Sequence, residues 1–414
     1  MILRALIALI LVGFVESRRL ADPWLASRLP SLTRLTRAVV TSSSACPPHV
    51  YVHVPFCGRR CSYCDFSIAV RRVVPSQRFI DAISAEVVTR GVGPVRGDLR
   101  TLYFGGGTPS KLGTAIGQIT KLISTLAGSS LPPGEVTVEA NPEDISPAVV
   151  SAWAQAGVNR VSLGVQSFDA GVLRWMHRSH DASAVREAVR TIRGEGIDDI
   201  SLDLIYALPD SVQRDWTADL GQAIELEPQH LSLYGLTVEP QTPLGRWATR
   251  GTVQPTPEER YEQEFIEAHR RLSDAGFGHY EVSNYAIPGR EAVHNSAYWS
   301  GAPYLGLGPS AHGFDGTTRR WNRRDYAGWL GLVEAGQDPV EDSETIDEGA
   351  RAAERVYLGL RTSAGLEARP DELRHAARWV DEGWADLKDG RLRLTPLGWL
   401  RLDALAADLL AATA

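Results

Sequence analysis

Cysteine is scarce in this chain: four are present among 414 residues, and three of these lie within eight residues of one another. So few thiols, clustered in this way, argue against a disulfide framework. We expect the remaining one, Cys46, to be an unpaired bystander. Basic residues are not in excess either, because the formal net charge is −7, so the composition gives no sign of a nucleic-acid partner.

Long apolar runs are also lacking. A comfortable membrane span needs about 20 apolar residues, whereas the run from Leu3 to Val15 is shorter and contains Arg4. This run has the length of a signal-peptide core, but no small-x-small cleavage site follows it. We therefore expect residues 1–48 to be a weakly structured extension, with membrane contact left open but not predicted.

The clustered cysteines, Cys57, Cys61 and Cys64, have the spacing C-x3-C-x2-C and follow an apolar run. Thiolates at this spacing in a loop can converge on a soft metal centre such as an iron–sulfur cluster. Three ligands leave one iron of a [4Fe–4S] cube without a protein partner, and an open coordination position is typical of a reacting metal. The alternative is a zinc site, which normally needs a fourth Cys or His nearby, and only His53 is available.

Apolar or β-branched runs alternate with helical patterns along residues 49–240. The runs are Val50–Val54, Leu99–Phe104, Val136–Glu139, Arg160–Val165, Ile200–Ile205 and His230–Leu233. The helical patterns are Gln77–Thr89, Lys111–Leu126, Pro147–Gln155, Ala182–Glu195 and Val212–Glu225. Such alternation predicts parallel βαβ units and an α/β fold. Six units rather than the eight of a closed barrel predict a partial (β/α)6 TIM-like barrel.

Glycine and polar residues follow these runs, where the ligand-binding loops of such barrels lie. The stretch Gly105-Gly106-Gly107-Thr108 allows backbone groups to approach a ligand, although taken alone it is better interpreted as an ordinary turn. Glu139 closes the third run and Asp203 interrupts the fifth. An unpaired buried carboxylate is costly, so we expect Asp203 to pair with Arg178 or a ligand, and Glu139 to bind a ribose hydroxyl or an ammonium group.

The stretch "YVHVPFC…CSYCDF" around the cysteines resembles the radical S-adenosylmethionine (SAM) superfamily, in which SAM chelates the open iron. Within it, the stretch is similar to the coproporphyrinogen-oxidase-like branch, and the resemblance covers about residues 49–410. It implies a radical SAM barrel in which Cys57, Cys61 and Cys64 hold a [4Fe–4S] cluster. The residues that it implies in SAM binding are Tyr51, Tyr63, Gly106, Gly107, Thr108, Glu139, Gln166, Arg178, Asp203 and Gly235.

That branch contains two activities. Oxygen-independent coproporphyrinogen III oxidase decarboxylates propionate side chains through a 5′-deoxyadenosyl radical, and its motif has a further cysteine where this chain has Phe66. The other activity is that of heme chaperones, which bind heme and deliver it to acceptor hemoproteins, and "CDF" resembles these. We therefore expect a cytoplasmic heme chaperone. A scaffold that binds cluster and SAM without cleaving SAM is a third alternative.

The segment His294-Asn295-Ser296-Ala297-Tyr298 matches the H-N-x-x-Y signature of the chaperone branch, which makes His294 and Tyr298 the heme candidates. Imidazole and phenolate are both known heme ligands, and residues four apart share one face of a helix. The alternative is a packed, hydrogen-bonded histidine. Chaperones of this branch often carry a cysteine at the position of Ala292, so attachment through that thiol is excluded here. His312, in "YLGLGPSAHGF", is a secondary candidate.

Two further regions complete the chain. We expect residues 241–345, which carry the H-N-x-x-Y segment, to pack against the open side of the barrel. Residues 346–414 predict helices at Glu348–Arg361 and Pro370–Glu382, a hairpin turning at Asp389-Gly390, and a helix from near Pro396. This order resembles a winged-helix domain. Its last helix is not basic, so covering the barrel or docking a partner suits it better than binding DNA.

Overall fold

The computed structural model describes residues 44–95, 98–128 and 134–412. Of the expected N-terminal extension, residues 1–43 lie outside these ranges, while β1 (Ser44–Cys46) is a strand that pairs in parallel with β5 (Val92–Val95). Within the described ranges, no helix is long and apolar enough to cross a membrane.

All six predicted strands are confirmed. They are β2 (His49–Val54), β6 (Thr101–Gly106), β7 (Glu135–Ala140), β8 (Arg160–Gln166), β9 (Asp199–Tyr206) and β10 (His230–Gly235). They pair in parallel and in chain order. All six residues of β2 are buried, as expected for a strand that is covered on both faces. The strands form the curved sheet of a partial barrel, with their carboxyl ends on one side.

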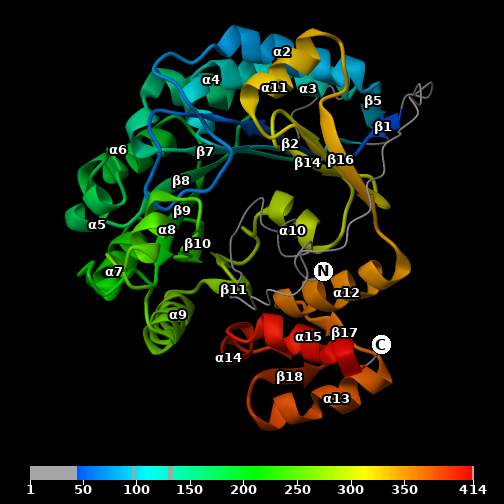
Figure 1. The fold of residues 1–414 in the computed structure, drawn as a ribbon. Coiled ribbons are helices and arrows are strands. Elements are labelled where there is room, and N and C mark those ends of the chain that lie inside the picture. The colour runs from blue at the N-terminus through cyan, green and yellow to red at the C-terminus, as the bar shows by residue number, and fades with distance from the viewer. Residues whose placement is uncertain (1–43, 96–97, 129–133, 413–414) are drawn as a thin grey trace.

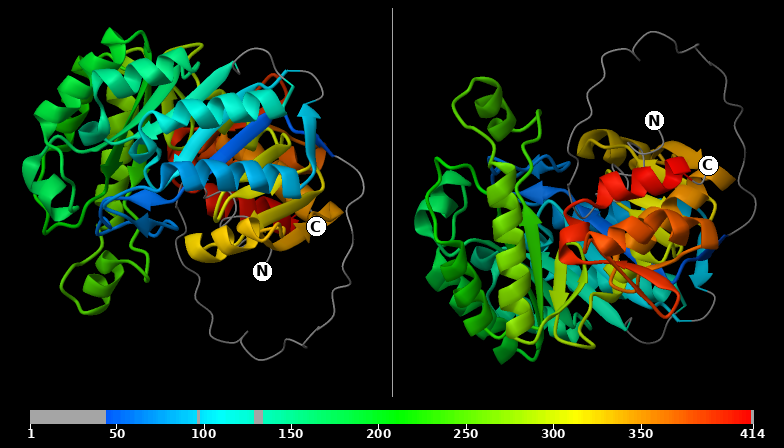
Figure 2. Two further views of the ribbon diagram at one scale, coloured as in Figure 1. Left: turned by 90° about the horizontal axis from the view of Figure 1, so that it is seen from above. Right: turned by 90° about the horizontal axis from the view of Figure 1, so that it is seen from below.

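The predicted helices are also confirmed, with ends shifted by a few residues in some. They are α2 (Ser76–Thr89), α3 (Ala115–Leu126), α4 (Pro147–Gln155), α6 (Ala182–Gly194) and α7 (Trp216–Glu225). Figures 1 and 2 show them along the outer face of the sheet. Their apolar stripes cover it, since Phe79 and Ile83 of α2 and Ile119 of α3 are fully buried. The short helix α5 (Ala170–Trp175) was not predicted.

Residues 241–345 do more than pack against the barrel, because they extend its sheet at both edges. After β10 come β12 (Asn284–Ala286) and β11 (Gly278–Glu281); next to β2 come β13 (Tyr304–Leu307), β14 (His312–Phe314), β15 (Thr318–Asn322) and β16 (Val340–Thr345), giving twelve strands. The same region contributes the helices α8 (Pro243–Thr249), α9 (Glu258–Asp274), α10 (Val293–Trp299) and α11 (Tyr326–Glu334). Of these, α10 lies on the inner side of the sheet (Figure 1).

The C-terminal region has the predicted helices and hairpin in the predicted order, together with a short strand, β17 (Leu366–Glu367), that was not predicted, and two helices in place of the single last one. In chain order the elements are α12 (Glu348–Arg361), β17, α13 (Pro370–Asp381), the hairpin of β18 (Ala385–Lys388) and β19 (Arg391–Leu394), α14 (Pro396–Trp399) and α15 (Leu402–Ala412). Both hairpin turn residues, Asp389 and Gly390, have positive φ, as a two-residue turn requires. The region is anchored by a buried ion pair of 2.8 Å between Arg361 and Glu281, and Arg361 also lies over the ring of Trp299.

Candidate functional site

A single cavity of about 970 Å³ collects the residues that the sequence singled out. It is lined by the three clustered cysteines, by every residue that the resemblance implied in SAM binding, and by Tyr298. His294 does not line it. Ligand sites typically occupy about 300–1,000 Å³, so this cavity is at the upper end of that range.

The three cysteines enter the cavity from the loop that follows β2. Cys57 ends β3 (Phe56–Cys57), and all three are unpaired, partly exposed thiols. The Sγ atom of Cys57 lies 3.3 Å from the hydroxyl of Thr108, and the guanidinium of Arg178 donates to the Sγ of Cys61 at 3.8 Å. Cys46 is a buried, unpaired thiol on β1, in agreement with the prediction.

The donor set, three thiols, is of the soft kind that holds iron–sulfur clusters. Among the described residues, no three Cys, His, Asp or Glu side chains are grouped as ligands of one metal ion. A [4Fe–4S] cube receives each thiolate on a different iron, so its ligands surround a volume instead of meeting at a point. His53 is engaged elsewhere, because its Nδ1 lies 3.2 Å from the Tyr51 hydroxyl and its Nε2 lies 3.1 Å from the Ser67 carbonyl.

Backbone conformation shapes the rim of the cavity at two strand ends. Gly106 has a φ of 114°, and a Cβ there would lie 2.7 Å from the ring of His53, so both the conformation and the packing require glycine. Gln166, at the end of β8, has a φ of 67° and follows an irregularity in the pairing with β9. Such a strained residue beside a cavity is typical of a functional site.

The two predicted carboxylates lie in the cavity with different partners. Glu139 accepts hydrogen bonds from the Tyr103 hydroxyl at 2.9 Å and from the backbone N–H of Gly106 at 3.1 Å. Burial raises the pKa of Glu139 to about 7, and the nearby charge of Asp203 adds to this. Burial likewise raises the pKa of Asp203 to about 6.

The expected pairing of Asp203 with Arg178 is wrong. Asp203 accepts hydrogen bonds from the hydroxyl of Ser162, at 2.9 Å, on the neighbouring strand. Arg178 donates instead to the side chain of Asn141 at 2.6 Å and to the carbonyl of Gly164 at 2.8 Å. Serine hydroxyls from adjacent strands therefore satisfy the buried carboxylate, and Arg178 stays at the rim, near the cysteines.

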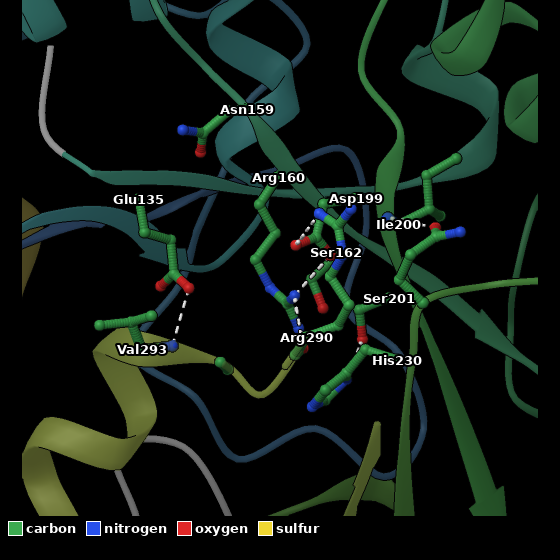
Figure 3. Close-up of polar contacts among 12 residues, drawn as sticks. Glu135, Asn159, Arg160, Ser162, Asp199, Ile200, Ser201, His230, Arg290 and Val293 are labelled. Atoms are coloured by element: carbon green, nitrogen blue, oxygen red, sulfur yellow. Dashed lines mark hydrogen bonds and ion pairs between the residues drawn. The ribbon is translucent and has the colours of Figure 1, made fainter. Parts of the chain in front are cut away.

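The amino-terminal ends of the strands form a polar floor that sequence reasoning missed (Figure 3). Arg160 donates to Asp199 at 2.6 Å, and Nδ1 of His230 lies 2.8 Å from the Ser201 hydroxyl. Arg160 and His230 line the same cavity as the cysteines. The sequence of β8 could have predicted this floor, because polar residues and glycine alternate with apolar ones along the strand. Its inward face consists of Arg160, Ser162, Gly164 and Gln166.

The H-N-x-x-Y segment forms α10 and enters a buried chain of hydrogen bonds. Glu135 caps the helix by accepting from the backbone N–H groups of Val293 at 2.7 Å and His294 at 2.9 Å. The Nδ1 atom of His294 lies 2.7 Å from the Thr101 hydroxyl, and its Nε2 lies 2.7 Å from the Tyr298 hydroxyl. Both ring nitrogens are thus engaged, and Tyr298 is the member of the pair that faces the cavity.

Comparisons with known proteins show which sequences and folds this chain resembles. The sequence profile of the radical SAM superfamily matches residues 51–220. The chain is 32% identical over 320 residues to the heme chaperone HemW of Bacillus subtilis, covering 77% of this chain and 84% of that protein. It is 35% identical to HemW of Mycobacterium tuberculosis strain H37Rv, covering 88% and 95%. The solved structure of coproporphyrinogen III oxidase (HemN) from Escherichia coli, a radical SAM enzyme, superposes with a TM-score of 0.72 at 22% identity, covering 88% and 90%. At this identity the last likeness concerns the fold alone.

Proposed function

This chain belongs to the HemW family of radical SAM proteins, and we propose that it binds a [4Fe–4S] cluster, SAM and heme and delivers the heme to acceptor hemoproteins. The observation that supports this best is the single cavity, which combines three thiols, the implied SAM-binding residues and Tyr298. A thiolate-held cluster persists in a reducing compartment, so the proposal assigns the protein to the cytoplasm.

Each group in the proposal has its own residues. Cys57, Cys61 and Cys64 hold the cluster, which when bound supplies an electron and one iron that is open to SAM. SAM is bound by the rim residues, with Gly106, Gly107 and Thr108 at its amino group and Glu139 and Asp203 accepting from its donor groups. Tyr298 faces the heme, and His294 holds the Tyr298 hydroxyl from behind.

The rival function is oxidation of coproporphyrinogen III, and Phe66 distinguishes the two. In the oxidase motif a cysteine stands at this position, whereas the Phe66 side chain here is 40% exposed and lines the cavity. A phenyl ring offers neither a metal ligand nor a redox-active thiol beside the cluster. The cysteine loop therefore favours the chaperone function.

The two functions are separated by one anaerobic experiment on the full chain. The cluster is reconstituted, and SAM, a reductant and coproporphyrinogen III are added; a second portion of the same preparation is titrated with heme. We expect stoichiometric heme binding and no decarboxylated porphyrinogen. Decarboxylated product without heme binding would establish the oxidase instead. Heme binding without 5′-deoxyadenosine formation would leave the chaperone function and assign the cluster a role other than SAM cleavage.

A further inference from the structure

His312 is an imidazole of the cavity whose Nδ1 atom has no hydrogen-bond partner among the described residues. It lies on β14 and lines the cavity, and its Nδ1 atom is buried. Leaving a polar atom buried and unpaired costs roughly 1–3 kcal/mol. Because Nδ1 itself is inaccessible, the ring nitrogen that a ligand in the cavity would reach is Nε2, which makes no hydrogen bond to the described residues.

His294 differs in each of these respects. Its side chain is 1% exposed, and it is held between Thr101 and Tyr298 by contacts to both ring nitrogens. Binding a metal would require the loss of one of these hydrogen bonds. Tyr298 does face the cavity, but burial raises the pKa of its hydroxyl well above the ordinary value, so it remains a neutral phenol, which is a weaker iron ligand than phenolate.

The surroundings of His312 suit a flat, largely apolar ring system with acidic substituents. Trp321, directly opposite on β15, has its ring centroid 5.8 Å from that of His312 at an interplanar angle of 27°. Tyr298 and Phe66 also line the cavity, and aromatic side chains offer large apolar contact areas. The exposed Arg324 lies on the same lining and provides a guanidinium suited to a carboxylate.

We propose that His312, and not His294, is the axial protein ligand of the heme iron, with Trp321 flanking the porphyrin and Arg324 pairing with a propionate. This inference rests on the proposed heme-binding function and assigns the residue that holds the iron. Burial lowers the pKa of His312 to about 4, so its imidazole is neutral at physiological pH and its lone pair is available for a metal. In this arrangement His294 is a positioning residue that orients Tyr298.

The test is a titration of ferric and ferrous heme into the full chain, followed by absorption and electron paramagnetic resonance spectroscopy. We expect His312→Ala to weaken heme binding at least about tenfold and to change the coordination spectrum. His294→Ala should keep the wild-type coordination spectrum. His269→Ala is the matched control, because His269 is a partly buried histidine of α9 that does not line the cavity.

A second variant separates ligation from folding. Free imidazole added to His312→Gly should restore the wild-type coordination spectrum, which a purely structural defect would not allow. If His312→Gly does not fold, as judged by circular dichroism and by iron uptake into the cluster, His312→Gln replaces it because glutamine is of similar size but a poor iron ligand. Wild-type affinity and spectrum in His312→Ala would overturn the inference while heme binding stands. Absence of heme binding by the wild-type chain would overturn the proposed function itself.

Discussion

His294 and His312 lie close to the same cavity, yet the protein uses their ring nitrogens differently. Those of His294 are occupied by Thr101 and Tyr298, whereas Nδ1 of His312 has no partner among the described residues. A sequence signature can identify a functional residue without showing whether that residue binds the ligand or positions another side chain. Here the H-N-x-x-Y spacing produces a helix in which one side chain fixes another, and the uncommitted imidazole comes from a strand without such a signature.

The same contrast exists between the two ends of the barrel interior. At the floor, Arg160, Asp199, His230 and Ser201 satisfy one another. At the rim, the three thiols form no disulfide and have only weak contacts, to Thr108 and Arg178, and Nε of Arg178 is buried without a partner among the described residues. Polar groups that satisfy one another support the fold, whereas an unpartnered group of a residue that lines the cavity is available to a ligand. The predictions below test this division between groups whose hydrogen bonds are satisfied within the protein and groups that are available to ligands.

The largest effect is expected on cluster binding, when one of the three cysteines of the cavity is replaced. Cys61→Ser should abolish the cluster, and SAM binding with it, because two thiolates and a hydroxyl do not hold a [4Fe–4S] cube. Heme binding should persist, since the proposed iron ligand is His312. Iron and sulfide analysis and a heme titration measure the two effects. The control is Cys46→Ser, which alters a buried thiol outside the cavity and should retain the cluster. An intact cluster in Cys61→Ser would contradict the assignment of Cys61 as a cluster ligand.

Acid should destabilise the protein because several buried histidines must take up a proton when it unfolds. Burial lowers the pKa of His294 to about 3 and that of His230 and His279 well below the ordinary value. In the unfolded chain these groups bind a proton near pH 6.5. The unfolded state therefore binds more protons at these histidines below that pH, and their contribution to the free energy of unfolding should fall by several kcal/mol between about pH 6.5 and 4. Glu139 and Asp203, whose pKa values are raised to about 7 and about 6, offset part of this fall because their protonation favours the folded state in the same range. Urea unfolding of the heme-free protein at stepped pH values measures this, and a constant free energy would contradict it.

How much of this could be predicted from the sequence depends on the range of the interactions. The six parallel strands could be predicted because short apolar or β-branched runs, each followed by a helical pattern, recur along the sequence. The strands β12 and β14 could not, because three residues carry no periodicity and their pairing depends on distant partners. β13 pairs with β2, although some 250 residues separate them in the chain.

The site shows the same limit. Strand-end residues such as Glu139 and Gln166 could be predicted because parallel strands bring their carboxyl ends together. Of the two partners predicted for Asp203, Arg178 is wrong, because charge alone suggested it, whereas the hydroxyl of Ser162 on the neighbouring strand donates to this carboxylate; the other, a ligand, stays a prediction. The engagement of His294 was invisible in the sequence, because Thr101 is 193 residues away along the chain.

Breaking the hydrogen-bond chain of Thr101, His294 and Tyr298 should lower the stability of the fold without affecting heme coordination. His294→Ala leaves the Thr101 and Tyr298 hydroxyls without their buried partner, and each such loss costs roughly 1–3 kcal/mol. Urea unfolding should show a decrease of this order, while the heme absorption spectrum stays that of the wild type. Tyr298→Phe, which removes one hydrogen bond of the chain and keeps the ring, should cost less. A changed heme spectrum with unchanged stability in His294→Ala would reverse the roles assigned to the two histidines.

The smallest effect concerns a carboxylate that is only partly satisfied. Burial raises the pKa of Glu139 to about 7, despite donors from Tyr103 and Gly106. SAM carries positive charge and favours the ionised form, so its affinity should increase as the pH rises through about 7. Glu139→Gln should weaken SAM binding about tenfold at pH 8 and remove most of this pH dependence.

Glu143→Gln is the contrasting variant. Hydrogen bonds from His180 and Ser179 overcome burial and lower the pKa of Glu143 to about 2, so that carboxylate is ionised throughout and the pH dependence should remain. Calorimetry of SAM binding to the reconstituted protein at several pH values distinguishes the two, and a pH dependence that survives in Glu139→Gln would move the titrating group to Asp203.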